Sequence, residues 1–232
     1  KHATIAPEFI GIADLFTRIS DVQPISNLPL LFEFYDCYVK TCKTTPDSFE
    51  EFLSWGQTAL KDFSEIDQYL VNPDKIFPYI HALKEAEHWS GMDERTEMQE
   101  KYLAFWRRLG DYYFALNTRL EELGKGYGGY IAKKAVEKLP QYLQTHTDTI
   151  HIFVGFNALS EAEQKVIQSI LIDIGGEIYW DGDTYFLKNQ THEAGYFLRK
   201  YLKNWRYYNT LNHTPKFIGS HYEEEKEFHL TG

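Results

Sequence analysis

The sequence has little cysteine, since Cys37 and Cys42 are its only two among 232 residues. They lie five residues apart in one predicted helix or at its frayed end, so their side chains point in different directions and a disulfide would distort the backbone. Neither belongs to a CxxC pair or to a Cys/His group at zinc spacing. Two free thiols are typical of a reducing compartment, and we expect a cytoplasmic protein.

Long apolar runs are also missing. No stretch approaches the roughly 18 apolar residues that a membrane helix requires, and the N-terminus lacks the basic and then apolar pattern of a signal peptide. We therefore expect no membrane association. The chain begins with Lys1 and ends with Leu230-Thr231-Gly232, which has the pattern of an interrupted strand. We interpret it as an internal fragment of a longer protein.

Basic residues are outnumbered by acidic ones. The 24 Lys and Arg face 34 Asp and Glu, which gives a formal net charge of −10. An acidic surface repels phosphate, so we do not expect a strong general DNA clamp, and any nucleic-acid role must be local. Hydrophobic residues make up 43% of the chain, enough for one large domain or two small ones.

Apolar residues recur at helical spacing over residues 1–147, which predicts a helical bundle. Asp47-Ser48-Phe49-Glu50 has the form of a capping box, in which a side-chain oxygen and a following Glu satisfy exposed backbone amides. Asn72-Pro73 suits the start of another helix because proline is favoured in the first turn. The longest pattern, 93–123, predicts one helix or two collinear helices meeting near Gly110. The remaining predicted helices cover 8–19, a stretch that opens at Asn27, and 128–143.

The pattern changes at about residue 148. A short β-branched run at 150–154 predicts a buried strand, Ser160-Glu161-Ala162-Glu163 is a second capping box, and 177–180 predicts a second strand. A strand, a helix and a strand within about thirty residues form a βαβ unit with parallel strands. Later elements are a helix from His192 to Trp205 and two candidate strands, 216–220 and 226–230. Residues 148–232 thus predict a partial α/β sheet, and the fold class is helix-dominated α/β.

The chemistry of a nucleotide-binding α/β protein is missing from this unit. No GxxxxGK[ST] phosphate loop occurs, and the glycine-rich stretch 124–129 precedes a helix without a strand before it, so we interpret it as a turn between helices. In ATPases a strand like 150–154 ends in an acidic residue that holds the magnesium of the nucleotide. Here it ends in Val154-Gly155, which cannot bind a metal. The pattern indicates the fold without the catalytic site.

Three other groups invite a functional interpretation. Asp181-Gly182-Asp183 follows the second strand, where it is either a metal- or phosphate-sensing turn or a tight turn, and we favour the tight turn. Asp62, Glu65 and Asp67 lack the ligand density of a calcium loop, so a solvated helix end is favoured. His192-Glu193 has no second His four residues on and is interpreted as the first turn of a helix.

A set of basic residues lies near aromatic residues and could grip single-stranded nucleic acid through charge and stacking. Solvated helix faces beside core aromatics are the commoner explanation, and we favour it. The basic residues are Arg107, Arg108, Lys133, Lys134, Lys138, Arg199, Lys200, Lys203 and Arg206, and the aromatic ones are Trp106, Trp205, Tyr207 and Tyr208.

Several segments, in order, resemble large bacterial proteins of the PD-(D/E)XK nuclease family, the Bacteroidetes relatives of AddB/RexB, a subunit of a recombinational-repair helicase–nuclease. The matching segments are FLSWG at 52–56, KDFSEIDQYLV at 61–71, FVGFNAL at 153–159, YWDGDTYF at 179–186 and HEAG at 192–195. They span most of the chain. The stretch GYGG at 126–129 departs from the "GLAYEGM" of the relatives.

The resemblance implies a much longer parent with a superfamily I helicase-like core and a C-terminal nuclease domain. Residues 1–147 would be the helical insertion of the first motor domain (a 1B-type subdomain), and 148–232 a partial RecA-like sheet of P-loop helicase type. Strand 150–154 would occupy the Walker B place, and Asp181-Gly182-Asp183 the neighbourhood of helicase motif III. In such proteins the core is often degenerate and serves in DNA recognition, with which Val154-Gly155 agrees. The nuclease carboxylates and lysine have no match in this chain.

The leading hypothesis is therefore a catalytically inactive helicase-like module of a DNA-repair helicase–exonuclease. It assigns no catalytic, cofactor-binding or metal-binding residue to this fragment. Magnesium and ATP would belong to the parent complex, DNA would be bound through the parent, and the partner would be an AddA-like helicase subunit. The alternative is an acidic helical module for protein–protein docking, which the net charge of −10 favours mildly. A stand-alone metal enzyme that uses Asp181 and Asp183 is a third, disfavoured hypothesis.

Overall fold

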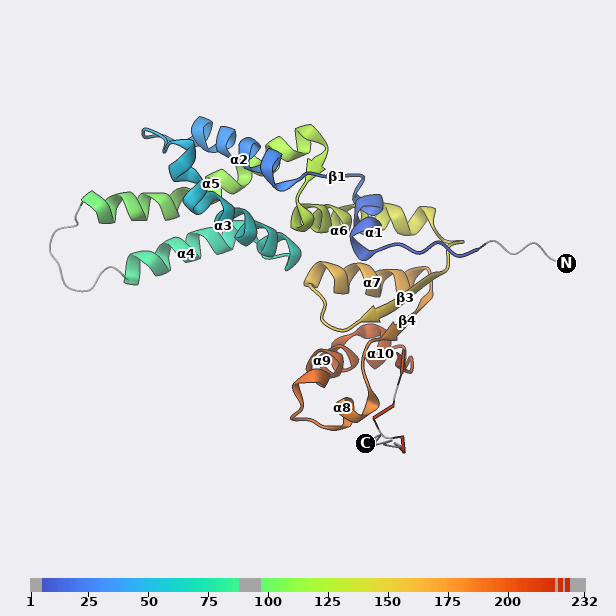
Figure 1. Cartoon of the computed structure of the whole chain (residues 1–232). Coiled ribbons are helices and arrows are strands. Elements are labelled where there is room, and N and C mark those ends of the chain that lie inside the picture. Colours follow the sequence, from blue (N-terminus) through green and yellow to red (C-terminus); the bar gives the residue numbers. More distant parts are fainter. Residues whose placement is uncertain (1–5, 88–96, 220, 223, 226–232) are drawn as a thin grey trace, which may run out of the picture. The chain divides into compact units, whose positions relative to one another are not determined.

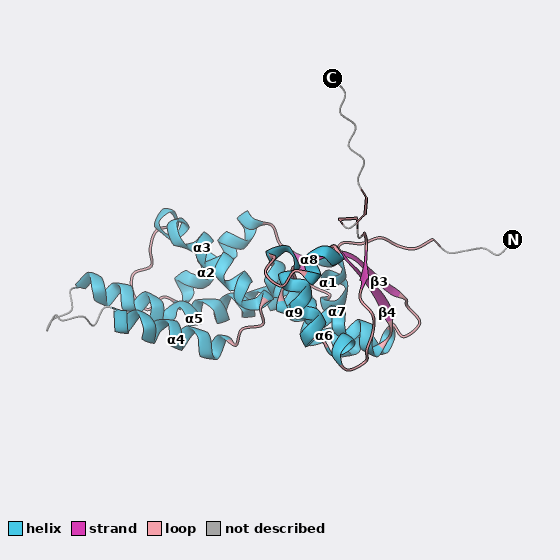
Figure 2. Cartoon of the chain, turned by 90° about the horizontal axis from the view of Figure 1, so that it is seen from below, coloured by secondary structure: helices cyan, strands magenta, loops and turns pink. Residues whose placement is uncertain are grey.

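The computed structural model describes residues 6–87, 97–219, 221–222 and 224–225. The chain is mostly helical and carries small parallel sheets, as predicted for a helix-dominated α/β protein (Figures 1 and 2). It divides into two compact units, Lys1–Lys138 and Leu139–Gly232. We predicted a boundary at 147/148, and the observed division falls earlier, inside the last helix of the helical region. No helix among the described residues is long and apolar enough to cross a membrane.

The first unit consists of helices and one very short pair of strands. Its elements are α1 (Ile12–Ser20), β1 (Gln23–Pro24), α2 (Asn27–Thr41), α3 (Phe49–Gln68), α4 (Pro73–Glu87), α5 (Glu97–Leu123), β2 (Lys125–Gly126) and α6 (Gly128–Thr145), which runs past the unit's end. The starts at Asn27 and Pro73 confirm the sequence-based prediction. The first helix begins later than predicted, because the chain up to Gly11 is extended and Phe9 remains 91% exposed.

The capping box of α3 lies one residue later than predicted. Ser48 is the N-cap, its Oγ accepts from the Glu51 backbone N–H at 3.3 Å, and Glu51 Oε2 accepts from the Ser48 backbone N–H at 2.8 Å. Asp47 makes a tertiary contact instead, since its carboxylate accepts from Trp55 Nε1 at 3.2 Å. Two adjacent capping residues and two adjacent glutamates make both registers possible locally, and the Trp55 contact favours the observed one.

The longest predicted pattern is one continuous helix, α5, with Gly110 inside it. It ends at Leu123, and Gly124 follows with a φ of 61°, the left-handed conformation that glycine adopts at low cost. The core of the first unit is rich in aromatic rings. Phe34, Phe52 and Phe63 are fully buried, with Phe34 in edge contact with both other rings at centroid distances of 5.1 and 5.6 Å.

The strands β1 and β2 form a short parallel pair. Gln23 is in register with Lys125 and Pro24 with Gly126. The Gln23 N–H donates to the Gly124 carbonyl at 3.0 Å, and the Ile25 N–H donates to the Gly126 carbonyl at 3.0 Å. The pair therefore joins the α1–α2 connection to the α5–α6 connection.

The second unit contains the predicted βαβ arrangement. Its elements are β3 (His151–Phe156), α7 (Glu161–Asp173), β4 (Gly176–Trp180), α8 (Thr184–Lys188), a 3-10 turn (Glu193–Gly195), α9 (Tyr196–Asn204), α10 (Arg206–Asn209) and β5 (Lys216–Phe217). The sheet order is β3-β4-β5, and both pairings are parallel. Ser160 and Glu163 form the predicted capping box of α7.

Some predictions for this unit were wrong in detail. The short helix α8 was not predicted, and the expected helix from His192 to Trp205 is a 3-10 turn followed by α9, with Trp205 in an extended conformation before α10. The candidate strand at 216–220 shortens to Lys216–Phe217. The candidate strand at 226–230 lies outside the described residues.

Helix α7 lies on one side of β3 and β4 (Figure 2). That face of the sheet is buried, with Phe153, Ile178 and Trp180 at 6%, 2% and 0% exposure. The opposite face carries Ile152 and Val154, which are 59% and 56% exposed and alternate with Phe153 along β3. Parallel sheets are normally covered on both faces, so this apolar face is unusual for the described residues alone.

Candidate functional site

The carboxyl ends of β3 and β4 are the place where an α/β protein would bind a nucleotide. β3 runs through Val154, whose side chain is exposed, and Gly155, whose φ of 86° coincides with a register shift against β4. The next polar side chain, Asn157, donates from Nδ2 to the Asp181 carbonyl at 3.1 Å. No acidic side chain stands at the end of β3, as the sequence indicated.

Asp183 has a structural role at the end of β4. Its two carboxylate oxygens accept from the backbone N–H groups of Tyr185, at 2.8 Å, and Tyr222, at 3.0 Å. Desolvation acts in the opposite direction, but these hydrogen bonds hold the pKa of Asp183 below its ordinary value. The backbone at Gly182 packs closely against Leu198, since a Cβ at position 182 would lie 2.3 Å from Leu198 Cδ1. The geometry agrees with the tight-turn interpretation of this segment.

His192 and Glu193 also lie where we predicted, at the start of a helical turn. His192 is the N-cap of the 3-10 turn, and its Nδ1 accepts from the Ala194 backbone N–H at 3.2 Å. Cys37 is not a candidate nucleophile, since burial raises the pKa of its thiol. Within the described ranges, no group of three or more His, Cys, Asp and Glu side chains is placed to hold a metal ion.

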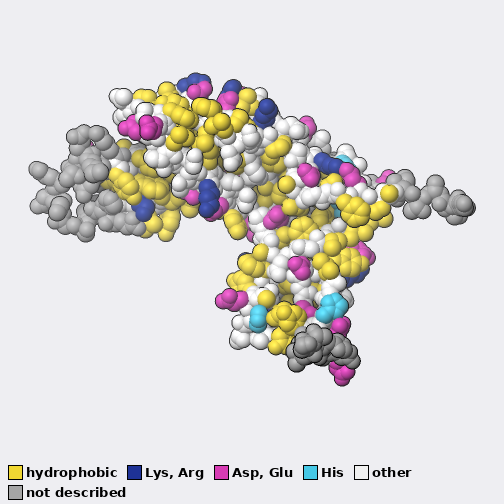
Figure 3. Space-filling view, viewed as in Figure 1, with side chains coloured by type: hydrophobic (Ala, Val, Ile, Leu, Met, Phe, Trp, Pro, Cys, Tyr) yellow, Lys and Arg dark blue, Asp and Glu magenta, His cyan; other side chains and the backbone are white. Residues whose placement is uncertain are grey.

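Several of the predicted basic and aromatic residues are not available to bind nucleic acid. Trp205, Tyr207 and Tyr208 are buried and cannot stack on a base. The Arg199 guanidinium is held by the carbonyls of Phe186, Asn189 and His192 at 2.7 to 2.9 Å. On the face shown in Figure 3, Lys and Arg side chains are scattered among acidic ones. This agrees with the solvated-face interpretation for most of the set.

The burial of Asp67 contradicts the prediction that Asp62, Glu65 and Asp67 form a solvated helix end. Asp62 and Glu65 are exposed, but Asp67 is buried at 1% exposure because it faces α5 and α6. Its Oδ1 accepts from Tyr113 at 2.5 Å and from Lys133 Nζ at 2.7 Å, and its Oδ2 accepts from Tyr127 at 2.6 Å. Lys133 therefore belongs to this cluster, although the sequence placed it on a polar face.

The cluster is completed by groups that satisfy its remaining polar atoms. Lys133 Nζ also donates to Asn117 Oδ1 at 2.7 Å, and the Gly129 backbone N–H donates to Ser64 Oγ at 3.2 Å nearby. Burial first, and then the Asp67 charge, raise the pKa of Tyr127 well above its ordinary value. A fully hydrogen-bonded buried network of this kind fixes the packing of α3, α5 and α6.

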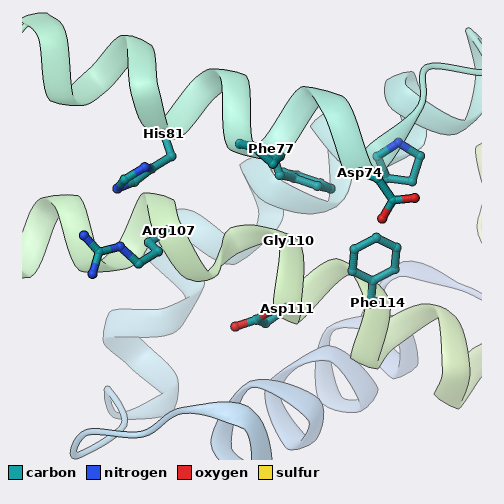
Figure 4. Close-up of a pocket in the computed structure, with 9 residues that line it drawn as sticks. Asp74, Phe77, His81, Arg107, Gly110, Asp111 and Phe114 are labelled. Carbon is teal, nitrogen blue, oxygen red and sulfur yellow. The ribbon is translucent and has the colours of Figure 1, made fainter.

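A cavity of about 310 Å³ lies between α4 and α5 (Figure 4). Each helix contributes four residues at positions i, i+3, i+4 and i+7, which share one helix face. These residues are Asp74, Phe77, Pro78 and His81 on α4 and Arg107, Gly110, Asp111 and Phe114 on α5; Pro73, the first residue of α4, also lines the pocket. The sequence analysis did not single out this pocket, although the two matching stripes are a signal that could have indicated it.

Two backbone features shape the pocket. Pro78 lies inside α4 and has no N–H, so the Asp74 carbonyl loses its helical donor. Gly110 allows α5 to approach α4, because a Cβ there would lie 3.2 Å from Phe77 Cβ. Any larger side chain at position 110 would project into the space beside Phe77.

The polar groups of the pocket lack partners. His81 Nε2 is buried and has no hydrogen bond among the described residues. Leaving such a nitrogen unsatisfied costs about 1–3 kcal/mol, so an unpaired group of this kind calls for a functional explanation. Figure 4 shows His81 and Arg107 near one end of the pocket, and Asp74 and Phe114 at the other. The pocket thus has a cationic end, an acidic end and an aromatic wall.

In comparisons with known proteins, no family model matches the chain and the search of curated proteins gives no match.

Proposed function

We propose that the chain is a catalytically inactive helicase-like module of a DNA-repair helicase–exonuclease of the AddB/RexB type, in which it contributes structure and DNA engagement. The observation that carries the proposal is the parallel β3–α7–β4 unit, whose first strand, His151–Phe156, carries Val154 and Gly155 and has no acidic residue. In this proposal the unit is part of a RecA-like sheet of P-loop helicase type, and the first unit is a 1B-like helical insertion. The ordered sequence resemblance supports the same assignment.

The residues at the end of β3 do not fit the magnesium ion of a bound nucleotide. Magnesium requires oxygen ligands in near-octahedral geometry. Gly155 and Phe156 at the end of β3 offer no side-chain oxygen, and the Asn157 amide that follows is held against the Asp181 carbonyl through its Nδ2. Both oxygens of Asp183 already accept backbone hydrogen bonds. Magnesium and ATP therefore belong, in this proposal, to the parent complex with its AddA-like helicase partner in the cytoplasm.

The electrostatics favour local DNA contact over general phosphate binding. A net charge of −10 opposes non-specific association, which is dominated by phosphate contacts. In this proposal DNA engagement comes from particular positions where a cation without a partner in the chain lies near an exposed ring. Among the described residues, the α4–α5 pocket has this character.

The first experiment tests the full-length parent on linear duplex DNA with magnesium, with and without ATP. We expect degradation that requires free ends. The isolated chain should neither hydrolyse ATP nor cut DNA, and it should bind forked DNA weakly and with strong salt dependence. Turnover by the clean isolated chain that is lost on Asp181→Ala or Asp183→Ala would overturn the proposal, as would a parent that leaves DNA intact with its partner present.

One observation favours a second candidate function, a protein–protein docking module. Ile152 and Val154 share an uncovered sheet face with the Glu177–Lys216 ion pair at 2.7 Å. Because parallel sheets are covered by helices on both faces, the occupant would be an amphipathic helix of the partner subunit. Its apolar stripe would cover the isoleucine and valine.

The two candidates differ in which variants matter. If docking is the function, Ile152→Lys weakens co-purification with the AddA-like subunit and leaves DNA binding unchanged. Lys188→Gln, at an exposed position of the same unit, is the control. Absence of DNA binding even at low salt, together with partner binding that Ile152→Lys disrupts, would favour the docking module over the DNA module.

A further inference from the structure

The α4–α5 pocket offers an aromatic wall to a flat ligand. The Phe114 ring is 42% exposed, whereas Phe77 is buried at 6% and closes the floor between the two helices. Exposed aromatic faces stack on nucleobases without regard to sequence, because every base has a π-face. A planar ring would lie against Phe114.

The two ends of the pocket carry opposite charges. His81 and Arg107 lie at one end, and Asp74 lies at the other (Figure 4). Asp111 follows Arg107 by one turn of α5 and lines the same cavity. A ligand that fits this arrangement has an anionic group at one end and hydrogen-bond donors on a ring at the other.

The charged side chains of the pocket are available to bind a ligand. The side chains of Arg107, Asp74 and Asp111 make no hydrogen bond or ion pair within the described part of the chain, unlike Lys133 and Arg199. His81 Nε2 is buried without a partner beside the same cavity. Several other cations of the first unit are paired, for example Lys134 with Glu121 at 2.8 Å.

The volume of the α4–α5 pocket limits its ligand to one small molecule or one residue of a polymer. A cavity of about 310 Å³ lies at the lower end of the range for small-ligand pockets, roughly 300–1,000 Å³. One nucleotide fits such a volume, whereas a base pair or a stacked dinucleotide does not. The neighbouring nucleotides of a strand would remain outside, over the exposed faces of α4 and α5.

We propose that this pocket binds one unstacked nucleotide of single-stranded DNA. The base stacks on Phe114, the phosphate is held by Arg107 and the imidazole of His81, and Asp74 and Asp111 accept hydrogen bonds from exocyclic amino groups. Cytosine, adenine and guanine carry such amino groups and thymine does not, so the pocket prefers these three bases to thymine. This inference rests on the proposed DNA function and names the place where the strand is held.

The test is fluorescence anisotropy of the whole 232-residue chain with short labelled oligo(dC) and oligo(dT), and with dCMP as competitor. Phe114→Ala should weaken oligo(dC) binding about tenfold through lost stacking. Tyr79→Ala is its matched control, an aromatic residue on α4 that is 64% exposed and does not line the pocket. Circular dichroism and urea midpoints show that each variant is folded.

Two further variants separate the phosphate and base contacts. Arg107→Gln should lower the slope of log Kd against log salt by about 0.7, the value for one phosphate contact on a single strand. Lys61→Gln, an exposed charge on α3, is its control. Asp111→Asn should reduce the preference for oligo(dC) over oligo(dT), a readout that a merely structural role would not change.

The outcomes distinguish this inference from the proposed function. If the chain binds oligonucleotides but Phe114→Ala and Arg107→Gln bind like their controls, the pocket assignment is overturned and the DNA module stands. If the chain binds no oligonucleotide while the parent degrades DNA from its ends, the pocket assignment is again overturned. If neither binding nor degradation occurs, both proposals fail.

Discussion

Asp67 and Lys133 form an ion pair at 2.7 Å in which the carboxylate is buried and the ammonium is largely covered. They come from α3 and α6, and Tyr113 of α5 donates to the same Asp67 oxygen. The pair thus sits where three helices meet. Removing one member of a buried, hydrogen-bonded pair leaves the other charge without compensation, which costs more than the pair itself contributes.

Asp67→Asn should therefore destabilise the first unit by about 3 kcal/mol, since Lys133 loses its counter-charge and the hydroxyls of Tyr113 and Tyr127 lose their anionic acceptor. Urea unfolding followed by circular dichroism measures the change. Glu65→Gln removes the same charge from an exposed position of α3 and should change stability by less than about 0.5 kcal/mol. Equal effects of the two substitutions would show that the buried pair has no special role.

Gly128 and Gly129 form a second matched pair in the first turn of α6. A Cβ at Gly129 would lie 2.2 Å from the Ser64 carbonyl oxygen, whereas a Cβ at Gly128 would meet nothing within 4 Å. Gly129→Ala should cost about 1–3 kcal/mol, because backbone must move. Gly128→Ala should be neutral or stabilise by up to about 1 kcal/mol. Thermal unfolding of both variants tests the prediction, which fails if the two alanines behave alike.

Substitutions of Asp183 and Asp181 distinguish a structural role of these residues from a metal site. Asp183→Ala should destabilise the second unit by about 0.5–2 kcal/mol, because the backbone N–H of Tyr185 loses its cap. Asp181→Ala should be close to neutral. Neither effect should depend on magnesium. Stabilisation of the wild-type chain by magnesium that disappears in both variants would instead indicate the disfavoured metal site.

Alkaline pH should unfold the chain. Burial is the largest cause that raises the pKa of Tyr112, Tyr130 and Tyr208, each to about 12, from an ordinary value near 10. Because the pKa is raised by folding, the protonated hydroxyls contribute stability to the folded chain. This contribution is complete below about pH 10 and decreases as the pH rises towards 12. The urea midpoint of the wild-type chain should fall over that range, and the midpoint of the Tyr130→Phe variant should fall less steeply.

The control for the alkaline prediction is Tyr79→Phe, which alters an exposed ring. Its pH dependence should match that of the wild type. Ultraviolet absorbance of tyrosinate should rise together with the loss of helical circular dichroism. Ionisation of the buried tyrosines in a chain that is still folded would contradict the prediction.

Local signals predicted the elements whose determinants lie within a few residues. Ser160 and Glu163 were sufficient to place the start of α7, and Gly124 to place the end of α5. The parallel pairing of β3 with β4 followed from the length of the connection between them. Where two local solutions were equally good, as at Asp47 and Ser48, a tertiary contact decided between them.

The burial of Asp67 could not be predicted because its partners are remote in sequence. Tyr113, Tyr127 and Lys133 approach it from α5, from the residue before α6 and from α6, and nothing near position 67 distinguishes it from its solvated neighbours. The α4–α5 pocket required knowledge of which helix faces which. The sequence did indicate that the first strand of this unit lacks an acid, although the strand ends at Phe156, two residues later than predicted.

The pairing of β1 with β2 has a consequence for synthesis of the protein. Gln23 meets Lys125 about one hundred residues later, so a large loop must close before this contact forms. A ribosome that makes the chain in order would release α1 to α4 well before β2 and the lysine of α6 are available. We expect the nascent helices to stay in a loose, chaperone-accessible state until that point. Completion of α6 would then lock the bundle in one late step.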